Sequence, residues 1–412
     1  MKKQLVVIGG GAAGVFCAVN AAARNPQLQV TVIEKTGKLL SKVKVSGGGR
    51  CNVTHHEEDI TAMSNRYPRG KHFVRKAFHE FFTTDTVQWF TSRGVPLKTE
   101  KDGRMFPVSN QSESIIQCLL REASDHQVEF RLNTNLVGVT VSAGVFELRL
   151  ERQGKEDQIK ADYLCLASGG MLKPEQFGWL FALGHSYVSP LPSLFTFNAP
   201  GHPITKLMGV AVQDAEVKLP SIKYRDRGPV LITHWGLSGP AVLKASAWCA
   251  RDLAAKEYTT SVIINWCPEE HEQSMREKLQ LFRHSMAAQL VRSRAPIELP
   301  QRLWEQLADE AGISAQRWAD LPSQLQNKLA KLITGYELPI KGKTTFKEEF
   351  VTAGGVQLSE VDPVTMESRK VPGLYFAGEV LDVDGVTGGF NFQHAWTSGW
   401  NAATHIAHKS LH

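Results

Sequence analysis

The feature that most constrains the fold is a glycine-rich hexapeptide near the start, Gly9-Gly10-Gly11-Ala12-Ala13-Gly14, which has the G-x-G-x-x-G spacing. It follows a short apolar run, Leu5–Ile8, and opens an alanine-rich segment that favours a helix. In such a turn Gly9 permits the tight bend, and Gly11 lets a pyrophosphate approach the helix N-terminus. Gly14 lets the helix pack closely on the strand. We therefore predict a Rossmann βαβ unit that binds an adenine dinucleotide.

An acidic residue narrows the choice of dinucleotide. Glu34 ends the next apolar run, Val30–Ile33, twenty residues after Gly14. A carboxylate at this place accepts hydrogen bonds from ribose hydroxyls and repels a 2′-phosphate. The unit is therefore expected to bind FAD or NAD in preference to NADP.

Two further segments favour FAD over NAD. Residues 46–52 read Ser-Gly-Gly-Gly-Arg-Cys-Asn, and a backbone without Cβ atoms can approach a flat ring or phosphates. Near the C-terminus an apolar run, Leu374–Ala377, ends in Gly378-Glu379 and is followed by Asp382 and by Gly388-Gly389-Phe390-Asn391. These acids can reach a cofactor held by Gly11 only if the C-terminal strand lies beside the first βαβ unit. We predict that it does.

The order of patterns along the chain predicts an α/β protein whose Rossmann-like FAD-binding domain is split in sequence. That domain comprises residues 1–190 and 346–412. A β-barrel-like insertion, rich in Pro, Gly and β-branched residues, is expected at 191–268 and 336–345. Apolar residues at helical spacing predict a helical subdomain at 269–335.

Composition restricts the partners and the compartment. The chain has 47 Lys and Arg against 41 Asp and Glu, a net charge of +6 without a run of like charges, which argues against a nucleic-acid partner. Its six cysteines include no C-x-x-C pair, which favours reduced thiols in the cytoplasm over disulfides or a metal site. The absence of 18 consecutive apolar residues argues against a membrane span.

Taken in this order, the fingerprint, the Ser-Gly-Gly-Gly-Arg-Cys-Asn segment and the C-terminal Gly-Glu-Val-Leu-Asp-Val-Asp-Gly-Val-Thr-Gly-Gly-Phe-Asn segment resemble a known family. It is the bacterial family of NAD(P)/FAD-dependent oxidoreductases that includes proteins named aminoacetone oxidase. That family is distantly similar to fumarate reductase flavoprotein subunits. The resemblance covers essentially the whole chain, including Thr233–Pro240 and the segment 350–356, and it implies an inserted β-barrel with a helical subdomain.

The resemblance also implies which residues contact FAD. Glu34 and Lys35 would hold the adenosine ribose, Ser46, Gly47, Gly48, Gly49, Arg50, Cys51 and Asn52 would line the isoalloxazine ring, and Val137 would offer its backbone to adenine. The remaining expected contacts come from Lys42, from Ala167, Ser168, Gly169 and Gly170, from Gly378, Glu379 and Asp382, and from Gly388, Gly389, Phe390 and Asn391.

Three side chains are candidates for a role beyond holding the cofactor, each with a plainer alternative. Arg50 could stabilise a reduced, anionic flavin or could simply bind phosphate. Cys51 could contact the flavin, although a buried structural thiol fits as well. His234, in Thr-His-Trp-Gly, could act as an acid or base, or could be structural.

The sequence predicts an FAD-dependent oxidoreductase that passes a hydride between a small organic substrate and flavin N5. FAD is expected to be non-covalent. Since no second fingerprint is present, NAD(P)H could serve only as a transient donor. An FAD-dependent RNA-modifying protein and a non-catalytic flavin-binding or assembly protein remain alternatives, and the substrate and the oligomeric state stay open.

Overall fold

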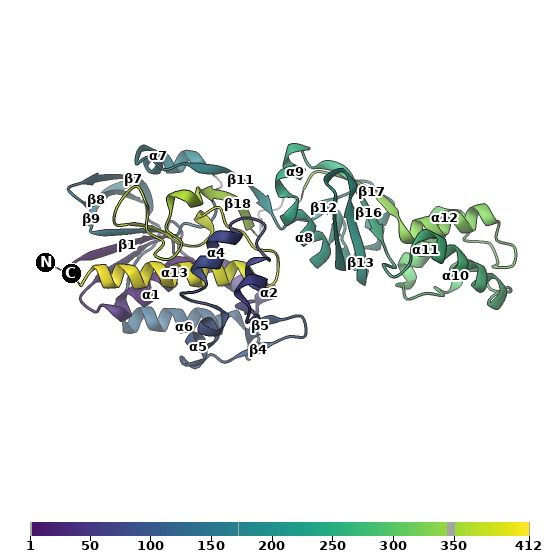
Figure 1. Cartoon of the computed structure of the whole chain (residues 1–412), viewed down its shortest axis with the longest axis horizontal. Coiled ribbons are helices and arrows are strands. Elements are labelled where there is room, and N and C mark those ends of the chain that lie inside the picture. Colours follow the sequence, from purple (N-terminus) through teal and green to yellow (C-terminus); the bar gives the residue numbers. More distant parts are fainter. Residues whose placement is uncertain (1, 172, 344–350, 412) are drawn as a thin grey trace. The chain divides into compact units, whose positions relative to one another are not determined.

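The computed structural model describes residues 2–171, 173–343 and 351–411. The chain forms two compact units, Met1–Leu191 with Val351–His412, and Pro192–Phe350 (Figure 1). The first unit is therefore discontinuous in sequence, and the second is inserted into it. The predicted boundary at 345/346 lies outside the described residues.

A five-stranded parallel sheet forms the centre of the first unit. Its strand order is β19-β10-β1-β2-β6, and β1 pairs in parallel with both β10 and β2. Four of the five strands are short runs of largely buried residues, as expected where a sheet is covered on both faces. The C-terminal strand lies next to β10, so the chain returns to this sheet after the inserted unit. The strand bounds are β1 Gln4–Ile8, β2 Gln29–Ile33, β6 Glu129–Arg131, β10 Tyr163–Leu166 and β19 Leu374–Phe376.

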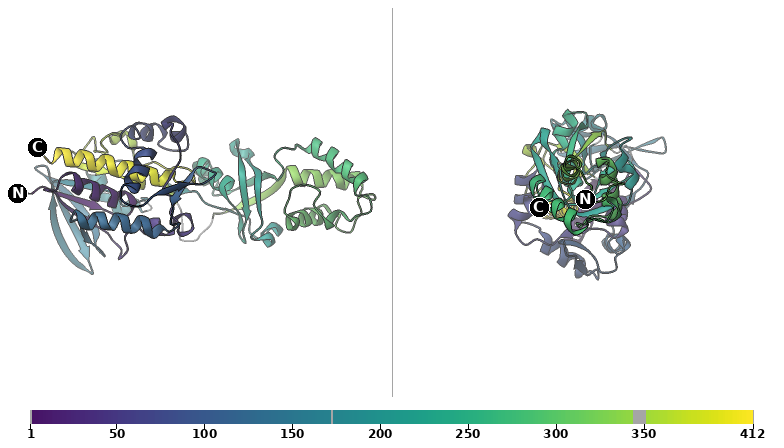
Figure 2. Two further views of the ribbon diagram at one scale, coloured as in Figure 1. Left: turned by 90° about the horizontal axis from the view of Figure 1, so that it is seen from below. Right: turned by 90° about the vertical axis from the view of Figure 1, so that its right-hand side faces the viewer.

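Two helices from opposite ends of the chain pack against each other in this unit, α1 (Ala12–Arg24) and α13 (Phe390–Lys409) (Figures 1 and 2). They meet at Gly399, where an added Cβ atom would lie 2.7 Å from the Ala13 carbonyl oxygen. Phe16 of α1 packs with Trp396 of α13, the ring centroids being 5.2 Å apart. This contact joins the fingerprint helix to the helix that follows the C-terminal flavin motif.

Smaller elements surround the parallel sheet. An antiparallel meander of β7, β8 and β9, a three-stranded sheet of β3, β5 and β4, and the pair β11 and β18 complete the strands of this unit. The meander strands are Asn135–Ser142, Val145–Arg152 and Lys155–Ala161, and the others are β3 Thr54–His55, β4 Leu97–Thr99, β5 Arg104–Pro107, β11 Tyr187–Ser193 and β18 Val351–Val356. The remaining helices are α2 Ser41–Gly49, α3 Ile60–Ser64, α4 Lys71–Ala77, α5 Thr83–Thr91, α6 Ser112–Asp125 and α7 Gly178–Ala182.

The second unit is built on a six-stranded sheet with the order β12-β15-β14-β13-β16-β17. A bridge between Phe197 and Lys343 links the two outer strands, so the sheet is nearly closed into a barrel. The strands are β12 Phe197–Asn198, β13 Ala211–Leu219, β14 Tyr224–Ile232, β15 Gly236–Ser238, β16 Thr259–Asn265 and β17 Tyr336–Lys341. Alternating burial along β17 places Tyr336, Leu338 and Ile340 in the core.

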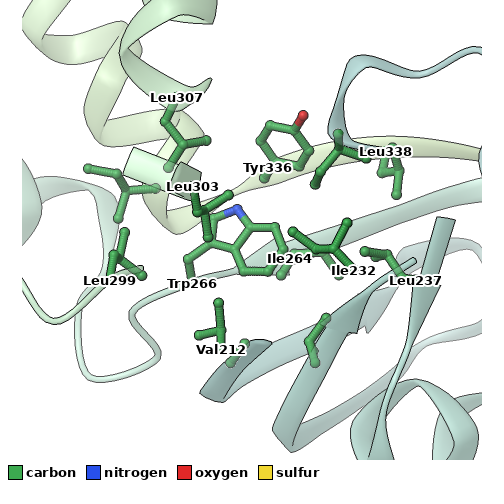
Figure 3. Close-up of a cluster of buried hydrophobic side chains, with 14 of the residues drawn as sticks. Val212, Ile232, Leu237, Ile264, Trp266, Leu299, Leu303, Leu307, Tyr336 and Leu338 are labelled. Atoms are coloured by element: carbon green, nitrogen blue, oxygen red, sulfur yellow. The ribbon is translucent and has the colours of Figure 1, made fainter. Parts of the chain in front are cut away.

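Helices of the second unit share the hydrophobic core of this barrel. Trp266, at the end of β16, packs among Leu303 and Leu307 of α11 and Tyr336 of β17 (Figure 3). The helical region predicted at 269–335 is therefore continuous with the barrel core in its packing. The helices are α8 Pro240–Trp248, α9 Ala250–Ala255, α10 Glu272–Ser285, α11 Gln301–Ala311 and α12 Ser323–Thr334.

The predicted fold class is confirmed: a parallel Rossmann-like sheet with an inserted, barrel-like antiparallel sheet. No helix among the described residues has the length and apolar character needed to cross a membrane.

Candidate functional site

The glycine fingerprint lies at the carboxyl end of β1, where open α/β sheets bind ligands. Gly9 has a φ of +112°, and an added Cβ atom would lie 2.3 Å from the Ala167 carbonyl oxygen. At Gly14 a Cβ atom would lie 2.0 Å from the Gly9 oxygen. At Gly11, the N-cap of α1, no protein atom lies within 4 Å of such a position. Gly9 and Gly14 are thus required by the fold, whereas Gly11 leaves open space beside the helix N-terminus.

Glu34 is fixed at the carboxyl end of β2. One carboxylate oxygen accepts from the Gly10 N–H at 2.8 Å, and the other accepts from the Thr36 N–H and hydroxyl, each at 2.8 Å. Carboxylate oxygens have further lone pairs, so the group can still accept from ribose hydroxyls.

A partly open cavity of about 80 Å³ lies beside Glu34. Glu34, Lys35 and Ser168 line it, as the adenosine assignment requires. Val137 does not line it: this residue is 44% exposed on β7, and its neighbour Leu136 faces the cavity. The predicted adenine contact of the Val137 backbone stays a prediction. The other lining residues are Ile8, Gly9, Ile33, Thr134, Asn135, Leu166, Gln176, Phe177 and Trp179.

The residues present fit the phosphate and ribose parts of FAD. The Ser168 hydroxyl is buried and has no hydrogen-bond partner among the described residues, although a buried hydroxyl normally has one. Gly11 leaves free space at a helix N-terminus, where unpaired N–H groups favour a pyrophosphate. One dinucleotide lying across the carboxyl ends of β1 and β10 could form hydrogen bonds with both the Ser168 hydroxyl and the N–H groups at the start of α1.

The glycine-rich segment 46–52 has the irregular backbone that its composition predicts. The chain leaves helical geometry at Ser46, and Gly47, Gly48 and Gly49 all have positive φ. An added Cβ atom would meet no protein atom within 4 Å at Gly48 or Gly49. This backbone is therefore accessible to a flat ring, as the isoalloxazine assignment requires.

Arg50 and Cys51 have different environments in this segment. The Arg50 guanidinium lies 4.0 Å from the Phe106 ring centroid and pairs with Glu100 at 2.6 Å. Glu100 offsets part of this charge, and flavin tuning by Arg50 stays a prediction. Cys51 is fully buried with a φ of +61°, and burial raises its thiol pKa to about 12. It is a neutral thiol at pH 7, which favours the structural alternative.

The C-terminal acids contact backbone amides of the strand β18. Glu379 accepts from the Thr352 N–H at 2.8 Å and pairs with Lys42 at 2.5 Å. Asp382 accepts from the Gly354 N–H at 3.0 Å. Both acids lie just beyond β19, whose neighbour β10 leads into Ala167, Ser168, Gly169 and Gly170. The structure thus brings Lys42, Glu379 and the segment after β10 together, as predicted for one cofactor site.

The loop before α13 is fixed from three sides. The Asn52 side chain is oriented so that its amide nitrogen donates and its amide oxygen accepts a hydrogen bond. In this orientation the oxygen accepts from the Gly389 N–H at 2.9 Å. A ring nitrogen of His55 bonds the Gly388 carbonyl at 3.1 Å, and the Tyr67 hydroxyl donates to the Phe390 carbonyl at 2.6 Å. The Asn391 side chain forms two hydrogen bonds with the backbone of Gly385 in the same loop: its oxygen accepts from the Gly385 N–H, and its nitrogen donates to the Gly385 carbonyl. The roles of Asn52, Gly388, Gly389 and Phe390 toward the flavin are consistent with this joint placement and remain predictions.

His55 and Tyr67 were missed at the sequence level. The signal for His55 is its position three residues after Asn52, the last residue of the glycine-rich segment 46–52. Its ring stacks on Phe390 with centroids 4.7 Å apart, and burial lowers its pKa. It is therefore a neutral positioning group for the loop before α13.

His234 lies in the second unit, in the turn between β14 and β15. Its ring packs edge-on against the Trp235 ring, with 4.0 Å between the centroids. The residue is exposed. Its predicted acid or base role remains untested.

A basic surface on α4 bears on the expected absence of a nucleic-acid partner. Residues 60–79 contain no Asp or Glu. Because Phe73, Val74, Ala77 and Phe78 are buried, the cationic residues interleaved with them gather on one exposed face. We call this the α4 basic face: Arg66, Lys71, His72, Arg75, Lys76 and His79. The expectation of no nucleic-acid partner stays a prediction.

The Glu34 assignment predicts that Glu34→Gln weakens FAD binding about ten- to a hundredfold, the loss of one charge-assisted bond of roughly 1.5–3 kcal/mol. Titration of apoprotein with FAD, followed by flavin fluorescence, measures it. Glu156→Gln, at an exposed site on β9, is the matched control and is expected to bind FAD as the parent does. Unchanged affinity in Glu34→Gln would remove Glu34 from the ribose site.

The parallel sheet, the fingerprint and the returning C-terminal strand define a Rossmann-type nucleotide-binding fold. The profile described as "HI0933-like protein Rossmann domain" matches residues 3–405, and the chain belongs to this family. It is 32% identical to the ribosomal RNA dihydrouridine synthase of Escherichia coli strain K12, over 98% of both chains. It is 29% identical to the 3-dehydro-bile acid delta(4,6)-reductase of Clostridium scindens, over 98% of this chain and 99% of that one.

Solved structures confirm the expected likeness to fumarate reductase flavoproteins at the level of the fold. E. coli quinol fumarate reductase FrdA superposes with a TM-score of 0.51 and 14% identity, over 100% of this chain and 71% of that chain.

Proposed function

We propose that the protein uses FAD to reduce a carbon–carbon double bond that is conjugated with a carbonyl group. The observation that carries the proposal is the joint site for one dinucleotide, in which the open space at Gly11, the carboxylate of Glu34 and the loop before α13 belong to a single unit. The named activities of two full-length relatives supply the reaction class.

Those two activities share one chemical step. Dihydrouridine is uridine whose ring double bond, conjugated with a carbonyl, has gained two hydrogens. A delta(4,6)-reductase of a 3-dehydro-bile acid acts on double bonds conjugated with the 3-keto group. In both, hydride addition to the carbon β to the carbonyl is favoured because the carbonyl oxygen takes up the developing negative charge.

The chain's own residues would bind and orient the reactants. When bound and reduced by the electron donor, the flavin would supply the hydride from N5. Glu34, Ser168 and the N-terminus of α1 hold its adenosine and pyrophosphate, and Asn52, His55 and Tyr67 fix the loop expected at the ring. Arg50 remains a candidate for stabilising negative charge on the reduced flavin.

The electron donor we propose is a reduced nicotinamide that binds transiently. The sequence has one G-x-G-x-x-G fingerprint, and in the proposed site FAD binds there. A nicotinamide dinucleotide would therefore have no Rossmann unit of its own in this chain.

Anaerobic stopped-flow tests the reaction. FAD-loaded protein is reduced with a stoichiometric amount of NADH or NADPH and mixed with a carbonyl-conjugated alkene, either a steroid enone or uridine-containing RNA. We expect the oxidised flavin absorbance to return with one acceptor, and mass spectrometry to show that this acceptor has gained two hydrogens. Saturated analogues are the control. Flavin that stays reduced with every acceptor would contradict the proposal and favour the non-catalytic alternative.

A further inference from the structure

We propose that the α4 basic face binds the phosphate backbone of an RNA and holds it beside the flavin-binding loop. The inference deepens the proposed function, on which it rests, by naming RNA as the molecule that carries the conjugated double bond.

The α4 basic face presents cationic groups without internal neutralisation. Apart from Arg69, four Lys or Arg and two His occur between residues 60 and 79, and this segment has no acidic residue. Within the described residues, the side chains of Lys71, Arg75 and Lys76 form no ion pair. Some exposed cations elsewhere do have acidic partners, as Arg227 has in Asp214 and Glu269. An unneutralised group of cations attracts a polyanion.

This face is rigidly joined to the loop expected at the flavin. Arg69 forms a buried two-bond ion pair with Asp384. The Val386 N–H donates to the Arg66 carbonyl at 2.9 Å, and the Tyr67 hydroxyl donates to the Phe390 carbonyl at 2.6 Å. A chain of phosphates bound along α4 is therefore held in register with the segment 384–390. An enzyme that acts on a base needs such register, because phosphate contacts position the strand while the base enters the site.

The surface chemistry favours RNA over an anionic membrane. A helix that lies on a membrane inserts an exposed apolar face, with its cations on the other face. The apolar residues of α4, Phe73, Val74 and Ala77, are buried in the protein core. The exposed groups are cations and imidazoles, which suit phosphates and the faces of unstacked bases.

RNA binding tests the inference without requiring turnover. The probe is a fluorescein-labelled oligouridylate, added to FAD-loaded full-length protein and followed by anisotropy across a salt series. The test variant is the triple substitution Lys71→Gln, Arg75→Gln, Lys76→Gln. The control variant, Arg152→Gln, Lys155→Gln, Lys160→Gln, removes the same charge from exposed positions of β8 and β9 in the same unit. FAD content and the thermal unfolding midpoint establish that both variants fold.

We expect the α4 variant to bind the oligouridylate at least about tenfold more weakly than the control variant. The slope of log K against log salt should fall by about 2, as expected for three lost contacts to a single strand. Equal affinity of the two variants would overturn the proposal. So would tight binding to vesicles of anionic phospholipid that the α4 substitutions abolish while RNA binding persists. Retained RNA binding without reduction of uridine would count against the proposed reaction and leave the RNA surface intact.

Discussion

A methyl group added at Gly11 is expected to weaken FAD binding on the order of a hundredfold while leaving the apoprotein folded. No protein atom lies within 4 Å of the position that the Cβ atom of Gly11→Ala would take, and the Gly11 φ of −85° suits alanine. The methyl group would occupy the space predicted for the pyrophosphate, and loss of about two charge-assisted hydrogen bonds lowers affinity on the order of a hundredfold. The apoprotein should lose at most about 1 kcal/mol, the cost of alanine at an N-cap.

Gly14→Ala is the matched comparison and should behave in the opposite way. Its Cβ atom would lie 2.0 Å from the Gly9 oxygen, a backbone atom that cannot rotate aside. Overpacking of this kind costs about 1–3 kcal/mol. Urea unfolding of the two apoproteins, together with FAD titration, separates the effects. If Gly11→Ala binds FAD as tightly as the parent, the pyrophosphate does not lie at the start of α1.

The second large effect is expected at the buried ion pair between Arg69 and Asp384. The two side chains are 9% and 0% exposed, and two guanidinium nitrogens meet the two carboxylate oxygens. Arg69→Met leaves a buried carboxylate without its guanidinium partner, and removing one partner of a buried ion pair costs about 3–5 kcal/mol. Because this pair ties residues 66–70 to the loop before α13, FAD affinity should fall together with stability. Urea unfolding followed by circular dichroism measures the first effect, and flavin fluorescence the second.

A double variant distinguishes loss of packing from loss of charge pairing at this site. Arg69→Met combined with Asp384→Leu removes both charges, and an apolar pair of similar volume is often as stable as a buried ion pair. We expect it to recover most of the stability lost in Arg69→Met. A double variant as unstable as the single one would show that the charges themselves are not the source of the effect.

Much of the cofactor site could be predicted because its parts are continuous in sequence. The fingerprint, Glu34 and the segment 46–52 each combine residue types that a single backbone motif requires, and spacing alone reveals them. The split domain was predicted for a geometric reason: Glu379 can meet a cofactor held at Gly11 only if β19 joins the parallel sheet, which it does by pairing with β10.

Features that depend on pairs distant in sequence were missed. Gln176, Phe177 and Trp179 line the adenosine cavity, although their segment has no recognisable motif. The ion pair of Arg69 with Asp384 joins positions 315 residues apart, and nothing in either neighbourhood marks it. The α4 basic face was missed for a different reason. Its cations alternate with apolar residues in sequence, and only helical geometry collects them on one surface.

The packing of α1 on α13 has a consequence for the synthesis of the protein. Phe16 and Trp396 are 380 residues apart, so at roughly 5–20 residues per second about 20–75 s pass between their translation. Throughout that time α1 can pack on α6 but not on α13, while the whole inserted unit is being made. We therefore expect the first unit to complete its core, and to bind FAD, only after α13 has left the ribosome.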